Sequence, residues 1–253
     1  MYLILTIIVI LYILAKNRFP WSEVIVLNLE RRLEKFYTTK SQLLKHNITN
    51  IIRWEAVDGS TLKNYENYLH PNFQIYKWDA RKRGAVGNYL SFIQIHNHIV
   101  DKNNYLTLIL EDDIVLDDNF TKNFYLMWNL IKDDDWDLIY LGISNVTISK
   151  TKDKWIFYKK INDTFSLYTP YAENGELYGN FGLLIKPIVS KTWLQNSLPI
   201  TQASDSKLGS LVCGKKISVD NPSKIQSIPK ELKALVIYPP LITYTFYISD
   251  TSF

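Results

Sequence analysis

Short apolar runs alternate along the chain with segments in which apolar residues recur every three or four positions. Strands buried on both faces read as near-continuous apolar runs, whereas a helix with one buried side repeats its apolar residues at helical spacing. The runs predict strands over residues 23–29, 51–57, 105–110, 136–142 and 179–185, and the repeats predict helices over 30–46, 88–102, 119–132 and 187–194. This alternation predicts a single α/β domain with a mostly parallel central sheet.

Other stretches have no stable period. We expect an irregular surface segment over residues 64–79 and a pair of irregular strands or a loop over 148–171. The chain loses regularity from residue 202, with a loop-rich excursion expected over 209–231 and a last strand-like run over 234–247. Gly84 and Gly87 precede the helix expected from residue 88, so Gly87 would lie at a helix N-terminus, where backbone amides can receive phosphate. Plain helix initiation is the alternative.

The first fifteen residues carry no charge, and Lys16 and Arg18 follow them. At about 1.5 Å per residue, such a run covers about two thirds of a bilayer core of ~30 Å. We expect residues 1–18 to form a short hydrophobic helix that anchors the chain to a membrane, with a signal peptide as the alternative, and residues 21–253 to form the α/β domain. The membrane orientation stays open.

Composition narrows the classes of function. The chain has 253 residues, a net charge of +4 and a pI near 8.8, with its basic residues scattered, which argues against a nucleic-acid partner. A single cysteine, Cys213, excludes an internal disulfide framework, and no Cys or His cluster has the spacing of a zinc site. Any metal is therefore expected to have oxygen ligands.

Three carboxylates, Glu111, Asp112 and Asp113, follow the apolar run 105–110 directly. In open α/β sheets ligands bind beyond the carboxyl ends of the strands. Adjacent carboxylates repel one another unless a cation or hydrogen-bond donors compensate them, so this position suggests a divalent ion. A solvated acidic turn is the alternative.

Several segments, in this order, resemble glycosyltransferase family 25, which includes lipopolysaccharide-type glycosyltransferases and collagen galactosyltransferases. They are VIVLNLERR at 24–32, RWEAVDG at 53–59, GNYLS at 87–91, LILEDD at 108–113 and WDLIYLG at 136–142, with a later glycine-containing strand near 178–185. The resemblance implies a GT-A-like fold, a UDP-hexose donor (galactose or glucose), a divalent metal (Mn²⁺ or Mg²⁺), inversion at the anomeric carbon, and a glycan or glycoprotein acceptor.

Within this resemblance, Asp113 is expected to bind the metal and Glu111 the metal or the ribose. Side chains alternate along a strand, so Glu111 and Asp113 would share one side. Asp112 would face the other way and position the loop. A metal there would stabilise the charge that develops on the departing diphosphate.

The remaining candidates lie at other predicted strand ends or late in the chain. Asn28, Arg32 and Asp58 are candidates for the nucleotide, with turn formation or surface ion pairs as the alternative for each. Inverting transfer needs a general base, for which Asp205 is the candidate and Asp250 the alternative.

The chain departs from the family pattern at several positions. Ala85 and Phe92 replace an acid and a histidine, Lys35 stands where arginine is usual, and no histidine follows His98. A catalytically degenerate family member that binds a glycan or a partner protein is therefore the second hypothesis. A metal-dependent phosphoesterase is the third.

Overall fold

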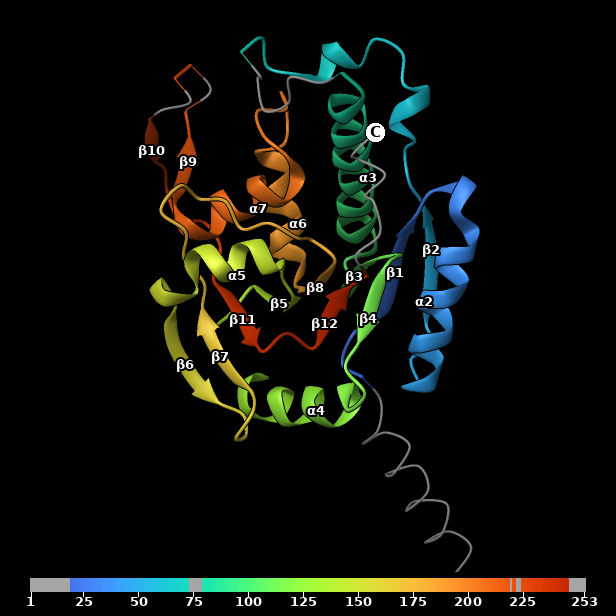
Figure 1. The fold of residues 1–253 in the computed structure, drawn as a ribbon, viewed down its shortest axis with the longest axis vertical. Coiled ribbons are helices and arrows are strands. Elements are labelled where there is room, and N and C mark those ends of the chain that lie inside the picture. The colour runs from blue at the N-terminus through green and yellow to red at the C-terminus, as the bar shows by residue number, and fades with distance from the viewer. Residues whose placement is uncertain (1–18, 73–78, 219, 222–223, 246–253) are drawn as a thin grey trace, which may run out of the picture.

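An eight-stranded mixed sheet forms the centre of the protein (Figure 1). The structure is a computed structural model that describes residues 19–72, 79–218, 220–221 and 224–245. In sheet order, the strands are β2 (Ile51–Glu55), β1 (Glu23–Asn28), β3 (Thr107–Glu111), β8 (Gly182–Ile185), β5 (Leu138–Gly142), β11 (Ala234–Tyr238), β7 (Ser166–Thr169) and β6 (Ile156–Lys160).

Helices cover both faces of this sheet. The α-helices are α2 (Leu33–Lys45), α3 (Asp79–Lys102), α4 (Phe120–Ile131), α5 (Asn145–Thr151), α6 (Pro187–Gln195) and α7 (Ser204–Cys213). Short 3-10 turns are η1 (Glu30–Arg32), η2 (Gly59–Thr61), η3 (Tyr65–Tyr68) and η4 (Lys152–Lys154). Two small sheets pair β4 (Ile114–Leu116) with β12 (Ile242–Tyr244) and β9 (Lys215–Ile217) with β10 (Ile225–Ser227).

Two hydrophobic cores lie on opposite faces of the sheet. Side chains alternate along β1, so Val24 and Val26 enter the core shared with α2 and α4, whereas Ile25 and Leu27 enter the core shared with α3, α6 and α7. Figure 1 shows α3, α6 and α7 together on one side and α4 on the other. Burial on both faces explains why these strands read as continuous apolar runs.

The prediction of a mostly parallel sheet was wrong. β1 pairs in parallel with β2 and β3, and β5 with β11. However, β8 lies antiparallel between β3 and β5, and β7 lies antiparallel between β11 and β6. Apolar content reports burial but not strand direction, so the reversal of β8 left no signal in its composition.

Two helix predictions also need correction. The helix predicted from residue 88 begins at Asp79, so Gly84 and Gly87 lie inside α3 and not in a loop before it. The stretch after residue 202, predicted to be irregular, contains α7, whose Leu208, Leu211 and Val212 face the core at helical spacing. The pair of strands predicted within 148–171 is present as β6 and β7, and α5 precedes them.

The predicted N-terminal hydrophobic helix, residues 1–18, lies outside the described residues. Among the residues that the structure describes, no helix combines the length and the apolar character needed to cross a bilayer.

Candidate functional site

The candidate site lies where β1, β3 and β5 end and β8 begins. Because β8 runs against its neighbours, the residues that precede it lie beside the carboxyl ends of β3 and β5. The backbone N–H of Glu111 donates to the carbonyl of Phe181 at 3.4 Å, and that of Ser144 donates to the carbonyl of Tyr178 at 3.1 Å. The segment 178–181 therefore forms one wall of this edge.

Glu111 and Asp113 are the centre of a cluster of negative charge. Burial raises the pKa of the Glu111 carboxyl above its usual value, and the charges of Asp113, Asp112 and Asp205 raise it further. Lys35 on α2 opposes this effect, with its Nζ 3.8 Å from the Asp113 carboxylate.

Asp112 turns toward the end of β1. Its carboxylate accepts a hydrogen bond of 2.5 Å from the Asn28 side-chain amide. Asn28, 1% exposed, also donates to the carbonyl of Arg32 at 2.8 Å and accepts from Nε of Arg53 at 2.9 Å. Asn28 therefore links the ends of β1, β2 and β3 by hydrogen bonds. These bonds use the side-chain amide of Asn28, which was expected to contact a nucleotide.

The acidic turn is also held through its backbone. The hydroxyl of Thr39 on α2 donates to the carbonyl of Asp112 at 2.8 Å. The backbone N–H and the hydroxyl of Thr245 both donate to the carbonyl of Asp113, at 2.8 Å and 3.1 Å. Contacts from distant parts of the chain thus fix the backbone of the two acids, which is the preorganisation that a binding site requires.

Asp205 lies in the first turn of α7 and faces the same edge. Its carboxylate accepts from the backbone N–H of Gly179 at 3.1 Å and of Ser206 at 2.7 Å. Burial raises the pKa of Asp205, and these backbone hydrogen bonds partly offset that rise. The structure thus brings Asp205 within electrostatic range of Glu111, although the two are 94 positions apart in sequence.

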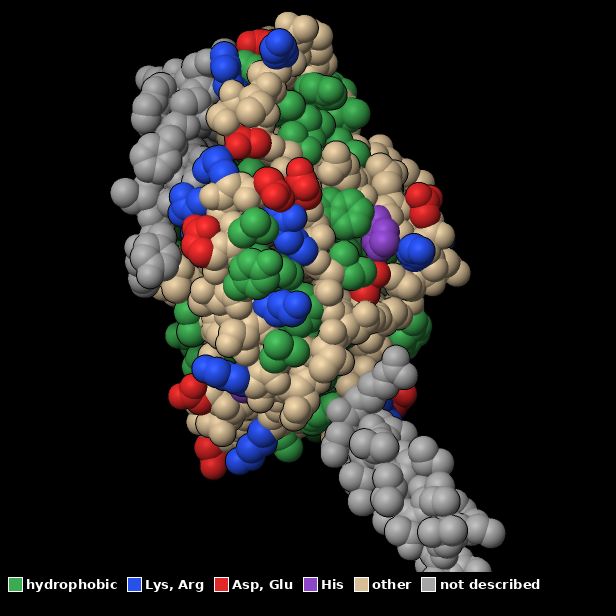
Figure 2. All heavy atoms as spheres, turned by 90° about the vertical axis from the view of Figure 1, so that its right-hand side faces the viewer, with side chains coloured by type: hydrophobic (Ala, Val, Ile, Leu, Met, Phe, Trp, Pro, Cys, Tyr) green, Lys and Arg blue, Asp and Glu red, His purple; other side chains and the backbone are tan. Residues whose placement is uncertain are grey.

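Arg32 and Asp58 lie in exposed hydrogen-bonded contacts. Asp58 caps η2 through Ser60 and accepts from Nε of Arg31 at 2.8 Å, and the hydrogen bond with Arg31 is the main cause of its lowered pKa. Arg32 contacts Glu34 at 3.2 Å. Figure 2 shows acidic and basic side chains interspersed on one face of the molecule. These contacts are of the kind given above as the alternative to nucleotide binding, namely turn formation and surface ion pairs.

Gly87 has a packing role in α3. A Cβ atom at Gly87 would meet the carbonyl oxygen of Val57 at 2.5 Å and the amide nitrogen of Gly59 at 2.7 Å. A glycine is required here because the helix backbone lies directly against the turn that follows β2. Since Gly87 is inside the helix, its amide is not at a helix N-terminus, so the prediction of its position was wrong and the reason for expecting phosphate there no longer holds.

Within the described ranges, no three Asp, Glu, His or Cys side chains converge in a way that could hold a metal ion by themselves. Glu111 and Asp113 supply the hard oxygen donors that Mn²⁺ or Mg²⁺ prefers. Their crowding with Asp112 and Asp205 is the situation that a cation relieves. Asp250, the alternative general base, lies outside the described residues.

Sequence reasoning missed two contributors to this site. Lys35 was noted as a departure from the family pattern, but its approach to Asp113 depends on how α2 packs beside β3, which no local pattern reports. The segment before β8 was taken as part of a strand. A local signal did exist for α7, because Leu208, Leu211 and Val212 repeat at helical spacing after Asp205.

Comparisons with known proteins define the class of this α/β protein. Residues 21–206 match the family model described as glycosyltransferase family 25 (LPS biosynthesis protein). The chain belongs to glycosyltransferase family 25. The match covers the described strands from β1 to β8, and it ends just after Asp205.

Individual relatives are distant. Procollagen galactosyltransferase 2 of Mus musculus is 25% identical over 141 residues, which are 53% of this chain and 23% of the relative. A probable inactive glycosyltransferase 25 family member 3 of Rattus norvegicus is 32% identical over 138 residues, 51% of this chain and 24% of the relative. A putative glycosyltransferase of Acanthamoeba polyphaga mimivirus is 28% identical over 168 residues, 64% of this chain and 49% of that protein.

The aligned part of this chain thus spans about a quarter of the length of the first two of these relatives.

Proposed function

We propose that this protein is an active, metal-dependent glycosyltransferase that transfers a hexose, galactose or glucose, from a UDP-sugar to a glycan or glycoprotein acceptor with inversion. The observation that carries the proposal is the buried Glu111 carboxyl, whose pKa is raised by burial and by Asp113, Asp112 and Asp205. Such crowding of acids at the end of a sheet is costly unless a cation and a ligand occupy the site.

In this proposal, Glu111 and Asp113 would hold the divalent ion. When bound, the ion stabilises the negative charge of the departing diphosphate as a Lewis acid. Lys35 adds a second positive charge beside Asp113. Asn28 and Asp112 set the positions of the strand ends, and Arg32 and Asp58 remain candidates for outer contacts with the nucleotide.

Asp205 is the proposed general base that takes the proton of the attacking acceptor hydroxyl. The direction of its pKa shift supports this role, because burial raises the pKa of the carboxyl and so makes it a stronger base than an exposed aspartate. Asp250 remains the alternative.

The test is UDP release from a panel of UDP-sugars with Mn²⁺, measured on the full chain. We expect release from one hexose donor, loss of that release in Asp113→Asn and on addition of a chelator, and normal release in Asp118→Asn. Asp118 is an exposed acid five positions further along, so it matches the change in charge without touching the site. Equal activity of the Asp113 and Asp118 variants would refute the assignment of the metal ligand.

The second candidate function is glycan or partner binding without turnover. The 32% identity to a probable inactive family member favours it. It predicts that UDP raises the melting temperature of the chain while no UDP-sugar is consumed under any metal condition.

A further inference from the structure

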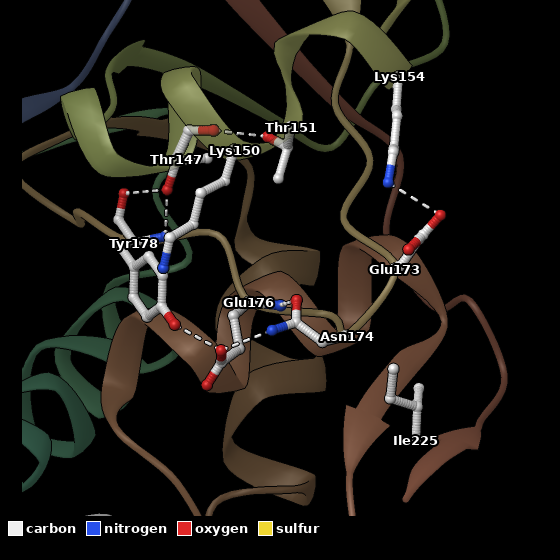
Figure 3. Close-up of a pocket in the computed structure, with 9 residues that line it drawn as sticks. All are labelled: Thr147, Lys150, Thr151, Lys154, Glu173, Asn174, Glu176, Tyr178 and Ile225. Carbon is white, nitrogen blue, oxygen red and sulfur yellow. Dashed lines mark hydrogen bonds and ion pairs between the residues drawn. The ribbon is translucent and has the colours of Figure 1, made fainter. Parts of the chain in front are cut away.

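A pocket of about 270 Å³ lies between α5, the residues around 173–178 and the tip of β10 (Figure 3). One wall comes from residues 174–178, and the other from α5 and η4. Its volume is below the roughly 300–1,000 Å³ of sites for drug-sized ligands, so it suits one sugar ring better than a chain of several.

The wall formed by residues 174–178 is held rigidly. Both the amide of Asn174, at 2.6 Å, and the hydroxyl of Tyr178 donate to Oε2 of Glu176. The Thr147 hydroxyl accepts from the backbone N–H of Tyr178 at 2.7 Å and donates to the Tyr178 carbonyl at 3.2 Å. The Tyr178 ring is therefore fixed in place, and a fixed aromatic ring offers a flat apolar face without further loss of side-chain entropy on binding.

Polar groups for hydroxyl recognition surround this ring. The Glu176 carboxylate accepts both of these hydrogen bonds through Oε2, which leaves Oε1 as an acceptor. Lys154 is paired with Glu173 at 2.9 Å. Lys150, by contrast, pairs with no carboxylate among the described residues, and its Nζ lies 5.6 Å from the centre of the Tyr178 ring. Figure 3 shows the Lys150 side chain alongside this ring.

The residues that follow Tyr178 in the chain link the pocket wall to the carboxylates. Gly179, which follows Tyr178, donates its backbone N–H to Asp205 at 3.1 Å, and the carbonyl of Phe181 accepts from Glu111. The charge of Glu176 also contributes to the raised pKa of Asp205. One short segment thus carries the ring of the pocket at one end and contacts the candidate general base and metal ligand at the other.

We infer that this pocket is the acceptor subsite, which binds a single pyranose residue against the Tyr178 ring. Glu176 accepts from the sugar hydroxyls and Lys150 donates to its oxygen atoms. The inference rests on the proposed function for its biological meaning, but the binding of sugar to the pocket can be measured without turnover.

The test uses saturation-transfer NMR on the full chain with the methyl pyranosides of glucose, galactose, N-acetylglucosamine and glucuronic acid as probes. Sorbitol, an open-chain polyol, is the negative control. We expect at least one pyranoside to bind, with saturating UDP present, and its Kd to rise about tenfold in Tyr178→Ala, which corresponds to ~1.4 kcal/mol. Lys150→Ala should also weaken binding. Because Lys150 is exposed, this variant should fold normally, so it tests the inference even if Tyr178→Ala does not fold.

Tyr37→Ala is the matched control, since Tyr37 is an exposed tyrosine on α2 with 61% of its surface accessible. The inference is overturned if no pyranoside binds, if UDP displaces the bound sugar, or if binding is unchanged in both the Tyr178 and Lys150 variants. Sugar binding with these properties but without UDP-sugar turnover would refute the proposed transferase activity and leave the pocket assignment standing.

Discussion

Replacing Lys35 with methionine is expected to make the stability of the protein depend more strongly on a divalent cation. The Lys35 ammonium lies 3.8 Å from the Asp113 carboxylate, and the two side chains are only 12% and 21% exposed. It is also the cation that lowers the pKa of Glu111 against three acids that raise it. Methionine keeps the apolar stem and removes the charge.

The size of the effect follows from this distance. Two unit charges about 4 Å apart attract by about 4 kcal/mol at an effective dielectric of 20. Removing the ammonium also removes its own desolvation cost, so the net loss is smaller, and we expect about 1–3 kcal/mol of unfolding free energy without metal. For a chain of this size, each kcal/mol lowers the melting temperature by roughly 2–4 °C.

A bound cation should compensate for this loss. An ion present at 100 times its Kd adds about 2.7 kcal/mol of stability, and without a competing ammonium the ion should bind the variant more tightly. The assay is calorimetric melting of wild type and Lys35→Met in a chelator and in excess Mn²⁺. Lys122→Met, which changes an exposed lysine on α4, controls for the loss of one charge.

The reasoning is refuted if Mn²⁺ raises the melting temperature of wild type and Lys35→Met equally. Full stability of Lys35→Met in chelator would also contradict it, because the carboxylates would then need no compensating charge.

Three further predictions concern the strand ends. In the unfolded chain Glu111 loses its proton near the usual pKa of 4.5, whereas in the folded chain its raised pKa keeps the proton bound to higher pH. The free energy of unfolding should therefore fall as the pH rises from 4.5 through the raised pKa. Glu111→Gln should remove this slope in metal-free urea titrations, whereas the exposed Glu34→Gln should retain it. Asn28→Ala should cost about 1.5–3 kcal/mol, read from the urea midpoint, because hydrogen bonds to Asp112 and Arg53 are lost; an equal midpoint would show that these contacts are dispensable. Gly87→Ala should lower stability by about 1–3 kcal/mol in spite of alanine's better helix propensity, because its Cβ would meet the Val57 carbonyl at 2.5 Å. A melting temperature at or above that of wild type would contradict this last expectation.

The sequence predicted the burial of the strands more accurately than their directions in the sheet. β1, β3 and β5 were located because their apolar residues fill both cores, and α4 because its apolar residues repeat at helical spacing. The antiparallel direction of β8 depends on how α5, β6 and β7 return the chain to the centre of the sheet. That information is not contained in the composition of any one segment.

The candidate site shows the same division. The position of Glu111 and Asp113 at a strand end could be predicted because an apolar run stops at an acid. The turn of Asp112 toward Asn28 and the hydrogen bond from Gly179 to Asp205 could not, since both join residues far apart in the chain. Gly87 was misplaced because glycine marks loops in most contexts, and here it marks a close contact between a helix and a backbone turn.

The reversed direction of β8 has a consequence for how substrate preference could change in this family. Because β8 runs against its neighbours, the residues just before it lie beside the carboxyl ends of β3 and β5. This connection holds Glu111 through the Phe181 carbonyl and Asp205 through the Gly179 amide. In the proposed enzyme, a substitution here would therefore change the acceptor side and the carboxylates together.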